Sequence, residues 1–254
     1  MNKRYCYPIV LLVFWFFSLQ ANAQLSIKDS VVFTPMIQIS YSYQIAAGDL
    51  TNRFGNNSNI GLSFLIKNKN NWIYGIDGSF IFGNEIKENQ VLKNISTNDG
   101  YIITANGQFA DVKLFERGYT AQVRGGRLIS VLSPNPNSGI FCTLGVGFLQ
   151  HKIRIENTGN TAPQLYGEYK KGYDRLSNGI AFSEFLGYTF LSNNRRVNFY
   201  FGFELYQALT KNRRTFNYDL MEKVDVKRQD FLNGFRIGWV IPLYEKLPNE
   251  YYYR

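Results

Sequence analysis

Apolar and polar residues alternate along eight segments of the chain. In the clearest of them, the apolar face consists of Ile37, Ile39, Tyr41, Tyr43 and Ile45, and the polar face of Gln38, Ser40, Ser42 and Gln44. Successive side chains of a β-strand point to opposite faces, so alternation with a period of two predicts a strand between two different environments. The eight predicted strands span about residues 36–46, 58–67, 71–83, 118–130, 139–149, 179–191, 196–209 and 229–243.

The connections between these strands alternate in length. Short segments rich in Asn, Pro or Ser follow strands two, four and six, at 68–71, 133–138 and 192–196. Long segments follow strands one, three, five and seven, at 46–57, 84–118, 150–178 and 210–230. Short turns at one end and long loops at the other are typical of transmembrane barrels. The sequence therefore predicts an all-β fold, an eight-stranded antiparallel up-and-down transmembrane β-barrel with long outer loops and periplasmic termini.

Two soluble folds share the alternation and have to be weighed. A β-sandwich would turn its apolar face inward, and a lipocalin-like barrel would need an apolar lumen, which the Phe- and Trp-rich faces would overfill. The predicted topology instead sorts aromatic residues to two rims, as expected at two lipid–water interfaces. One rim holds Trp72, Tyr74, Tyr188, Phe190, Phe199 and Trp239, and the other Tyr43, Phe80, Phe82, Tyr119, Phe148 and Phe231. This sorting favours the membrane barrel.

The N-terminus has the pattern of an export signal. Lys3 and Arg4 precede a nearly unbroken apolar run from Pro8 to Leu19, and Ala21-Asn22-Ala23 forms a small-x-small cleavage site. The alternative, a membrane anchor helix, needs about 20 apolar residues. The sequence thus predicts a signal peptide over 1–23 and a barrel domain over 24–254.

Charge and reactive residues exclude several function classes. The formal charge is +9, to which Lys3 and Arg4 contribute. Export argues against nucleic acid as the counter-charge and favours lipopolysaccharide phosphates. Cys142 loses its possible partner Cys6 with the signal peptide, and His151 is the single histidine. These counts predict no disulfide, no metal site and no cofactor.

Four charged residues are predicted to project into the lumen: Asp77, Arg124, Glu204 and Arg236. An eight-stranded barrel is just wide enough for side chains, and buried charges need partners. The residues therefore indicate a compensated cluster, either a plug of salt bridges or, less favoured, a proton or ion path. Glu184 falls on an apolar face and would join the cluster if a β-bulge near Ser183 turned it inward.

The third and fourth long loops carry basic clusters. Candidates to bind anionic lipid or an acidic protein partner are Lys170, Lys171, Arg175, Arg213, Arg214, Lys227 and Arg228, because Arg and Lys suit phosphate and carboxylate. The alternative is that they are solvated charges paired with their neighbours. In the second long loop, the turn signals Asn98-Asp99-Gly100 and Asn106-Gly107 predict an ordered β-extension.

Together, the export signal, the eight strands and the loop lengths resemble the small outer-membrane barrels of the OmpX, OmpA and OmpW type. The stretch from Gly48-Asp49-Leu50 to Arg53-Phe54-Gly55 and the Tyr-rich tail are similar to uncharacterised outer-membrane barrels of Bacteroidota. The resemblance implies a Gram-negative outer-membrane protein. Such barrels often end on an aromatic residue, whereas this chain ends Tyr251-Tyr252-Tyr253-Arg254.

The resemblance leaves two functions to compare. One is a non-enzymatic barrel that stabilises the outer membrane or serves as a subunit of an envelope assembly, in contact with lipopolysaccharide and other envelope proteins. The alternative is a lipid A-modifying enzyme with His151 as general base at the outer rim. No serine stands two positions after His151, so the sequence favours the non-enzymatic barrel and a polar interfacial role for His151.

Overall fold

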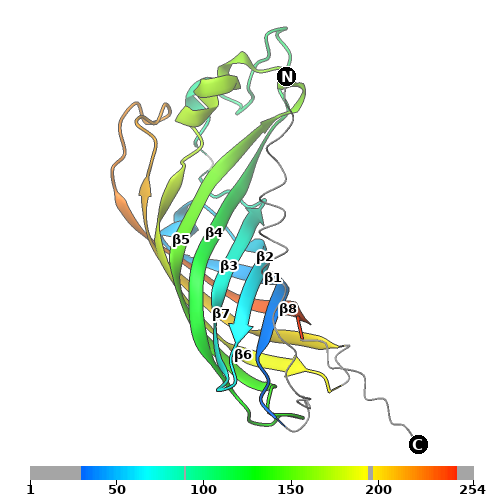
Figure 1. Cartoon of the computed structure of the whole chain (residues 1–254). Helices are drawn as coiled ribbons and strands as arrows, with labels where there is room; N and C mark the ends of the chain where they lie inside the picture. The colour runs from blue at the N-terminus through cyan, green and yellow to red at the C-terminus, as the bar shows by residue number, and fades with distance from the viewer. Residues whose placement is uncertain (1–29, 89, 194–196, 245–254) are drawn as a thin grey trace, which may run out of the picture.

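The structure, a computed structural model, describes residues 30–88, 90–193 and 197–244 (Figure 1). The predicted signal peptide and the Tyr-rich tail lie outside the described residues. The strands are β1 (Thr34–Gly48), β2 (Asn57–Lys67), β3 (Trp72–Gly83), β4 (Val112–Ile129), β5 (Gly139–Asn157), β6 (Ser177–Leu191), β7 (Asn198–Asn212) and β8 (Lys227–Pro242). Within these ranges, no helix is long and apolar enough to cross a membrane.

The eight strands close into one barrel. Each strand pairs antiparallel with the next, and β1 completes the circle by pairing with β8, from Met36 opposite Pro242 to Gly48 opposite Asp230. Closure leaves no sheet edge unpaired, which is the condition for strands to cross lipid. The predicted all-β, up-and-down topology is confirmed, and the order of the strands excludes the two-sheet sandwich.

The two faces of the barrel wall differ as a membrane requires. The outward face is apolar and exposed on all eight strands, with Leu144 68% and Phe203 67% exposed. The inward face of β1 buries Gln38, Ser40, Ser42 and Gln44. An apolar outer wall around a partly polar interior is the reverse of a soluble lipocalin. The chain is therefore a transmembrane barrel.

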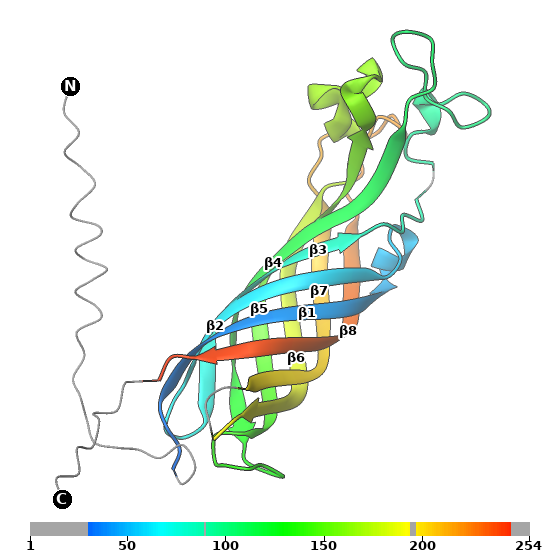
Figure 2. The same ribbon diagram turned by 90° about the vertical axis from the view of Figure 1, so that its right-hand side faces the viewer.

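β4 and β5 are longer than the sequence predicted. They pair without interruption from Val112 opposite Asn157 to Ile129 opposite Ile140, and so rise above the other strands to carry the second and third long loops (Figure 2). The predicted strands were too short because the apolar residues of β5 change position after Phe148. Up to Phe148 they occupy the outward positions, and beyond it they occupy the inward ones. Outside the membrane, Ile153 and Ile155 point inward and are buried, while Lys152 and Arg154 take the outward positions.

Three layers fill the interior. At the short-turn end lies an apolar layer that includes Met36, Leu65, Phe141, Phe185 and Tyr200. A charged layer follows at mid-height, and a second apolar layer closes the long-loop end. This outer layer joins Leu50, Phe54, Leu149, Ile153 and Tyr206 to buried loop residues such as Leu92, Ile102 and Leu165. The charges are thus enclosed from both ends.

The second long loop differs from its predicted β-extension. Apart from the residues that lengthen β4, it contains a short 3-10 turn, η2 (Lys93–Ile95), and the isolated bridge between Ile103 and Phe109. A further bridge joins Ile86 to Phe54 of the first loop. The loop buries Val91, Leu92 and Ile102 in the outer apolar layer, and packing rather than strand pairing positions it.

Candidate functional site

The structure brings the four predicted lumen charges together at the centre of the barrel. Glu204 Oε1 of β7 lies 2.6 Å from Arg124 Nη2 of β4 and 2.7 Å from Arg236 Nη1 of β8. Asp77 Oδ2 of β3 lies 2.6 Å from Arg236 Nη2, and Asp77 Oδ1 lies 3.7 Å from Arg124 Nη2. All four side chains are at most 1% exposed. Two acids and two bases therefore form a closed, charge-compensated ring.

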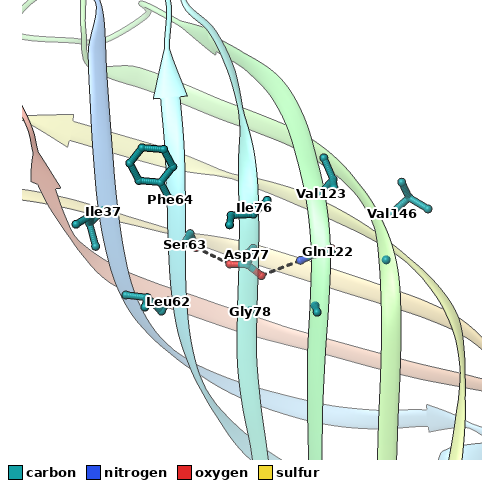
Figure 3. A pocket seen from close by; sticks show the side chains of 12 residues that line it. Ile37, Leu62, Ser63, Phe64, Ile76, Asp77, Gly78, Gln122, Val123 and Val146 are labelled. Carbon is teal, nitrogen blue, oxygen red and sulfur yellow. Dashed lines mark hydrogen bonds between the residues drawn. The ribbon is translucent and has the colours of Figure 1, made fainter. Parts of the chain in front are cut away.

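Neutral groups add hydrogen bonds to two members of this ring, Asp77 and Arg236. Asp77 accepts hydrogen bonds from Ser63 of β2 and Gln122 of β4, as Figure 3 shows. Arg236 Nε donates to Ser40 Oγ and to the hydroxyl of Tyr200, each at 3.0 Å. Among the described residues, Arg124 Nε, Arg124 Nη1 and Glu204 Oε2 are buried without a hydrogen-bond partner. The ring is therefore compensated in charge, its hydrogen bonding is incomplete, and it lies as a polar layer between two apolar ones.

A glycine creates the space for part of this layer. A Cβ atom on Gly145 of β5 would lie 2.4 Å from Ser183 Oγ and 2.5 Å from Gln122 Oε1. Ser183 donates to that same Gln122 oxygen, and Gln122 in turn contacts Asp77. The glycines that alternate along β5 therefore serve packing inside the lumen.

Glu184 does not join the cluster. β6 pairs regularly through this position, with Glu184 opposite Leu144 and Leu205, and no bulge interrupts this described strand near Ser183. Ser183 points inward, and Glu184 is exposed on the outer wall. The condition for Glu184 to join the cluster is therefore not met, because an unbroken register fixes alternate residues to opposite faces.

His151 lies inside the barrel instead of at the lipid-facing rim. It is 1% exposed, its Nε2 lies 2.9 Å from Asp230 Oδ2, and its ring packs edge-on against Phe54. Thr210 also donates to Asp230. The interfacial role predicted for His151 is wrong, because odd-numbered positions face inward along the whole of β5. Asp230, which the prediction treated as a loop residue, is its partner.

A network of ion pairs lies above this histidine, at the mouth of the barrel. Glu88 of the second loop bridges Arg53 Nε at 3.1 Å and Arg175 Nε at 2.7 Å, and Arg175 also pairs with Asp219 of the fourth loop. Arg53 Nη1 donates to the backbone carbonyl of Arg175 at 3.1 Å. Burial lowers the pKa of Arg53 to about 10, and the charge of nearby Arg228 acts in the same direction. The network ties four long loops together, and we call it the loop clasp.

Most of the predicted basic loop residues are engaged within the protein. Arg175 is buried in the loop clasp, so its guanidinium is not available to a ligand. Arg214 pairs with Asp174, and this hydrogen bond raises the pKa of the guanidinium. Arg228 donates to the carbonyl of Asp49. Intramolecular contacts also occupy Arg213, with Asn178, and Lys171, with Glu168, although both stay exposed.

Two predicted residues keep their ammonium groups at the surface of the long-loop end. Lys227 is exposed at the start of β8, and Lys170 is partly exposed in the 3-10 turn η5 (Gly167–Gly172). Lys223, which belongs to the same basic run, is exposed as well. The sequence could not separate these lysines from the paired arginines, since the acidic partners Glu88 and Asp219 come from other loops.

Solved structures with the same general architecture are small outer-membrane proteins. Neisserial surface protein A is 12% identical, with a TM-score of 0.39, over 81% of this chain and 95% of that one. Ail, the attachment invasion locus protein of Yersinia pestis, is 14% identical, with a TM-score of 0.37, over 82% of this chain and 98% of that one. OprG of Pseudomonas aeruginosa is 11% identical, with a TM-score of 0.37, over 84% and 99%.

No family model matches the chain, and no curated protein matches its sequence. The chain is a small eight-stranded barrel of the outer-membrane type. At these TM-scores the neighbours support no argument about function, which therefore rests on the geometry of the barrel itself.

The geometry limits what the interior can do chemically. Both arginines of the central cluster are held by carboxylates, and His151 is enclosed by protein. Among the described residues, no group of three or more His, Cys, Asp or Glu side chains is placed to hold a metal ion. The described interior is packed with side chains, with the charged ring between two apolar layers.

Proposed function

We propose that this protein is a non-enzymatic, integral component of the bacterial outer membrane, acting as a structural barrel or as a subunit of an envelope assembly. Its long loops face the outside and its termini the periplasm. The observation that carries the proposal is the charged ring of Asp77, Arg124, Glu204 and Arg236, fully buried between two apolar layers. A barrel with this interior has no water-filled path for solutes.

The same geometry weighs against the lipid A-modifying alternative. A general base must reach the substrate directly or through one water, whereas His151 is 1% exposed and its Nε2 is bonded to Asp230. The wall of the barrel separates this histidine from lipid. We therefore assign His151 to the packing of the outer half of the lumen.

The exposed lysines support contact with anionic lipopolysaccharide or an acidic envelope protein. Lys170, Lys223 and Lys227 present charges at the long-loop end, where lipid phosphates lie in the proposed orientation. Exposed ammonium groups attract phosphate with a strength that falls as salt rises. No nucleic acid is expected as a partner for an exported barrel.

The proposal is tested by reconstituting the full mature chain in planar bilayers and by comparing lipid A from cells with and without the gene. We expect membrane insertion, heat-modifiable gel mobility, no stepwise conductance and an identical lipid A mass spectrum. Regular conductance steps in the wild-type protein would contradict the sealed lumen. A change in the lipid A spectrum would reinstate the enzyme.

A further inference from the structure

Two basic side chains lie opposite each other on the outer wall of the barrel, just above the rim of aromatic residues at the long-loop end. Arg117 of β4 pairs in register with Lys152 of β5, and both side chains point outward. Arg154 occupies the next outward position of β5 toward the long-loop end. Like charges directly opposite each other destabilise a sheet, so the pair calls for a counter-anion. We call these three residues the basic wall block.

The described protein does not supply that anion. Arg154 pairs with Glu156 at 3.7 Å, with both side chains exposed, but among the described residues neither Arg117 nor Lys152 forms an ion pair. Neutral contacts hold Arg117 in place. Its guanidinium carbon lies 5.0 Å from the centre of the Phe115 ring, and its Nη1 donates to the preceding backbone carbonyl at 2.6 Å. The charge of Arg117 is therefore positioned but not compensated.

The tilt of the strands decides what lies beneath this block. Following cross-strand partners around the wall from Gln38 of β1 returns to β1 at Gly48, ten residues nearer the long-loop end. Each row of partners therefore rises by about 3 Å per strand in the direction from β1 to β8. A step of one strand back and two residues toward the short-turn end then runs nearly parallel to the membrane normal and descends by about 8 Å. From Lys152, two such steps lead to Tyr119 of β4 and then to Gly78 of β3.

Gly78 forms part of an apolar groove of about 660 Å³ on the outer wall (Figure 3). Its cross-strand partner Ala121 also lines the groove, so two small residues form a floor between larger ones such as Phe64 and Val146. A Cβ atom on Gly78 would have a single neighbour within 4 Å, a backbone oxygen at 3.8 Å, and the space in front of it is therefore open. Gly78 lies about 16 Å below Lys152, which is about the thickness of one leaflet of the hydrocarbon core.

We propose that this face of the barrel binds one phosphorylated saccharolipid of the lipid A class, with a phosphate on the basic wall block and an acyl chain in the groove beneath it. Arg and Lys donate charge-assisted hydrogen bonds to phosphate oxygens. Tyr119 lies between the two parts, as an aromatic residue does at the headgroup level. Three bases against Glu156 leave two positive charges, which favours a headgroup with two phosphates over a phospholipid with one. The inference rests on the proposed membrane orientation and names the lipid and the wall that holds it.

Native mass spectrometry of the full mature chain in neutral micelles with added diphosphoryl lipid A measures this binding. We expect one lipid per barrel, and we expect Arg117→Gln and Lys152→Gln each to raise the Kd by about tenfold. Arg127→Gln is the matched control. Arg127 lies on the same outward face of β4 but near the short-turn end, with its guanidinium carbon 5.6 Å from the Trp72 ring, so its variant should bind as the wild type does. Heat-modifiable mobility verifies that each variant is folded.

Two glycine variants test the groove separately from the charges. Gly78→Leu fills the floor of the groove and should raise the Kd for lipid A by about threefold, because close packing holds an apolar chain against a wall that already lies in lipid. Gly125→Leu is the control. A Cβ atom on Gly125 also faces open space, with its nearest neighbour at 3.9 Å, but Gly125 does not line this groove. Equal binding by the two leucine variants would overturn the assignment of the acyl chain to the groove.

The remaining outcomes separate this site from the proposed function. Unchanged binding in Arg117→Gln and Lys152→Gln, or an equal loss in Arg127→Gln, would overturn the lipid site and leave the sealed barrel intact. Phosphatidylglycerol or inorganic phosphate that displaces lipid A at the same concentration would also overturn it, in favour of a general anion surface. A wild-type chain that inserts into membranes but retains no lipid A would contradict the lipid site alone. Recovery of the protein in the aqueous fraction would instead overturn the membrane location itself.

Discussion

β5 passes through two regions of the molecule in which its apolar side chains point in opposite directions, outward in one and inward in the other. In the membrane band its apolar side chains point outward, with Leu144 68% and Val146 51% exposed. Above the band, Ile153 and Ile155 point inward and are buried, while Arg154 is exposed. The pairing with β4 continues through both regions without a break. The solvent around the strand changes while the backbone does not.

The difference shows that the solvent around a strand determines which of its two faces carries the apolar residues. In lipid, most outward positions are apolar and the interior can hold a charge-compensated cluster. In water, the outward positions become charged and the interior must be apolar to gain from burial. The two regions are therefore stabilised differently, by the charged ring of Asp77, Arg124, Glu204 and Arg236 in one and by hydrophobic packing with the loops in the other.

The largest expected effect comes from breaking the charged ring. Arg236→Ala leaves Asp77 and Glu204 buried beside a single arginine, and removing one partner of such a cluster costs about 3–5 kcal/mol. We expect the whole barrel to unfold at lower temperature and lower urea concentration, measured by heat-modifiable gel mobility in lipid vesicles. Arg154→Ala is the control, because its pairing with Glu156 is exposed and spans 3.7 Å. Its cost should stay below about 1 kcal/mol. Equal stabilities of the two variants would contradict a structural role for the ring.

Packing in the outer region should give the next effect. Ile153 is 0% exposed, and Ile153→Ala leaves a cavity in water-surrounded protein, at a cost of about 2–4 kcal/mol. We expect faster hydrogen exchange and proteolysis in the long loops while the membrane band stays folded. Ile180→Ala sharpens the comparison, since Ile180 is 59% exposed to lipid and acyl chains can fill the space. If the two variants lost equal stability, removing an apolar side chain would cost as much against lipid as against packed protein, which would contradict the comparison.

The sequence predicted side-chain directions correctly where a whole strand is surrounded by a single solvent. Eight alternating runs predicted the strands, and the polar positions within them predicted that Asp77, Arg124, Glu204 and Arg236 share the lumen. The sequence was misleading at His151, because the apolar residues of β5 move from the outward to the inward face near this position. The apolar residues that follow were therefore assigned to a loop. That reversal is readable in the sequence, because Ile153 and Ile155 alternate with Lys152 and Arg154.

The loop clasp could not have been predicted in the same way. Its members Arg53, Glu88, Arg175 and Asp219 come from four loops, and no period relates them. Glu184 is a different case. Its position in the alternation places it on the lipid face, and the question of a bulge arises only because a carboxylate is unfavourable there.

A smaller effect is expected from the loop clasp. Arg175→Ala removes two ion pairs and leaves Glu88 and Asp219 partly buried, which costs about 1–3 kcal/mol. We expect limited proteolysis to cleave the second and fourth loops sooner, with the melting of the membrane band unchanged. Lys170→Ala is the matched control, because Lys170 is a partly exposed residue of the same loop, and it should leave the proteolysis rate unaltered. Protection of the loops in Arg175→Ala would show that apolar packing alone holds them.

The smallest effect concerns pH at the surface of the fourth loop. A hydrogen bond from Lys211 lowers the pKa of Asp225 below its usual value of 3.8, and Lys223 and Arg213 nearby act in the same direction. A carboxyl with a depressed folded-state pKa adds stability that is present above the unfolded value and is lost as pH falls through the folded one. The gain of wild type over Asp225→Asn should therefore be constant near neutral pH, decline once the pH falls below 3.8, and vanish below the depressed folded-state pKa. Urea midpoints measured from pH 7 to pH 2 would show this, and a difference that persists in acid would assign the effect to the amide itself. Because this pair lies in water, its contribution should also fall as salt is raised.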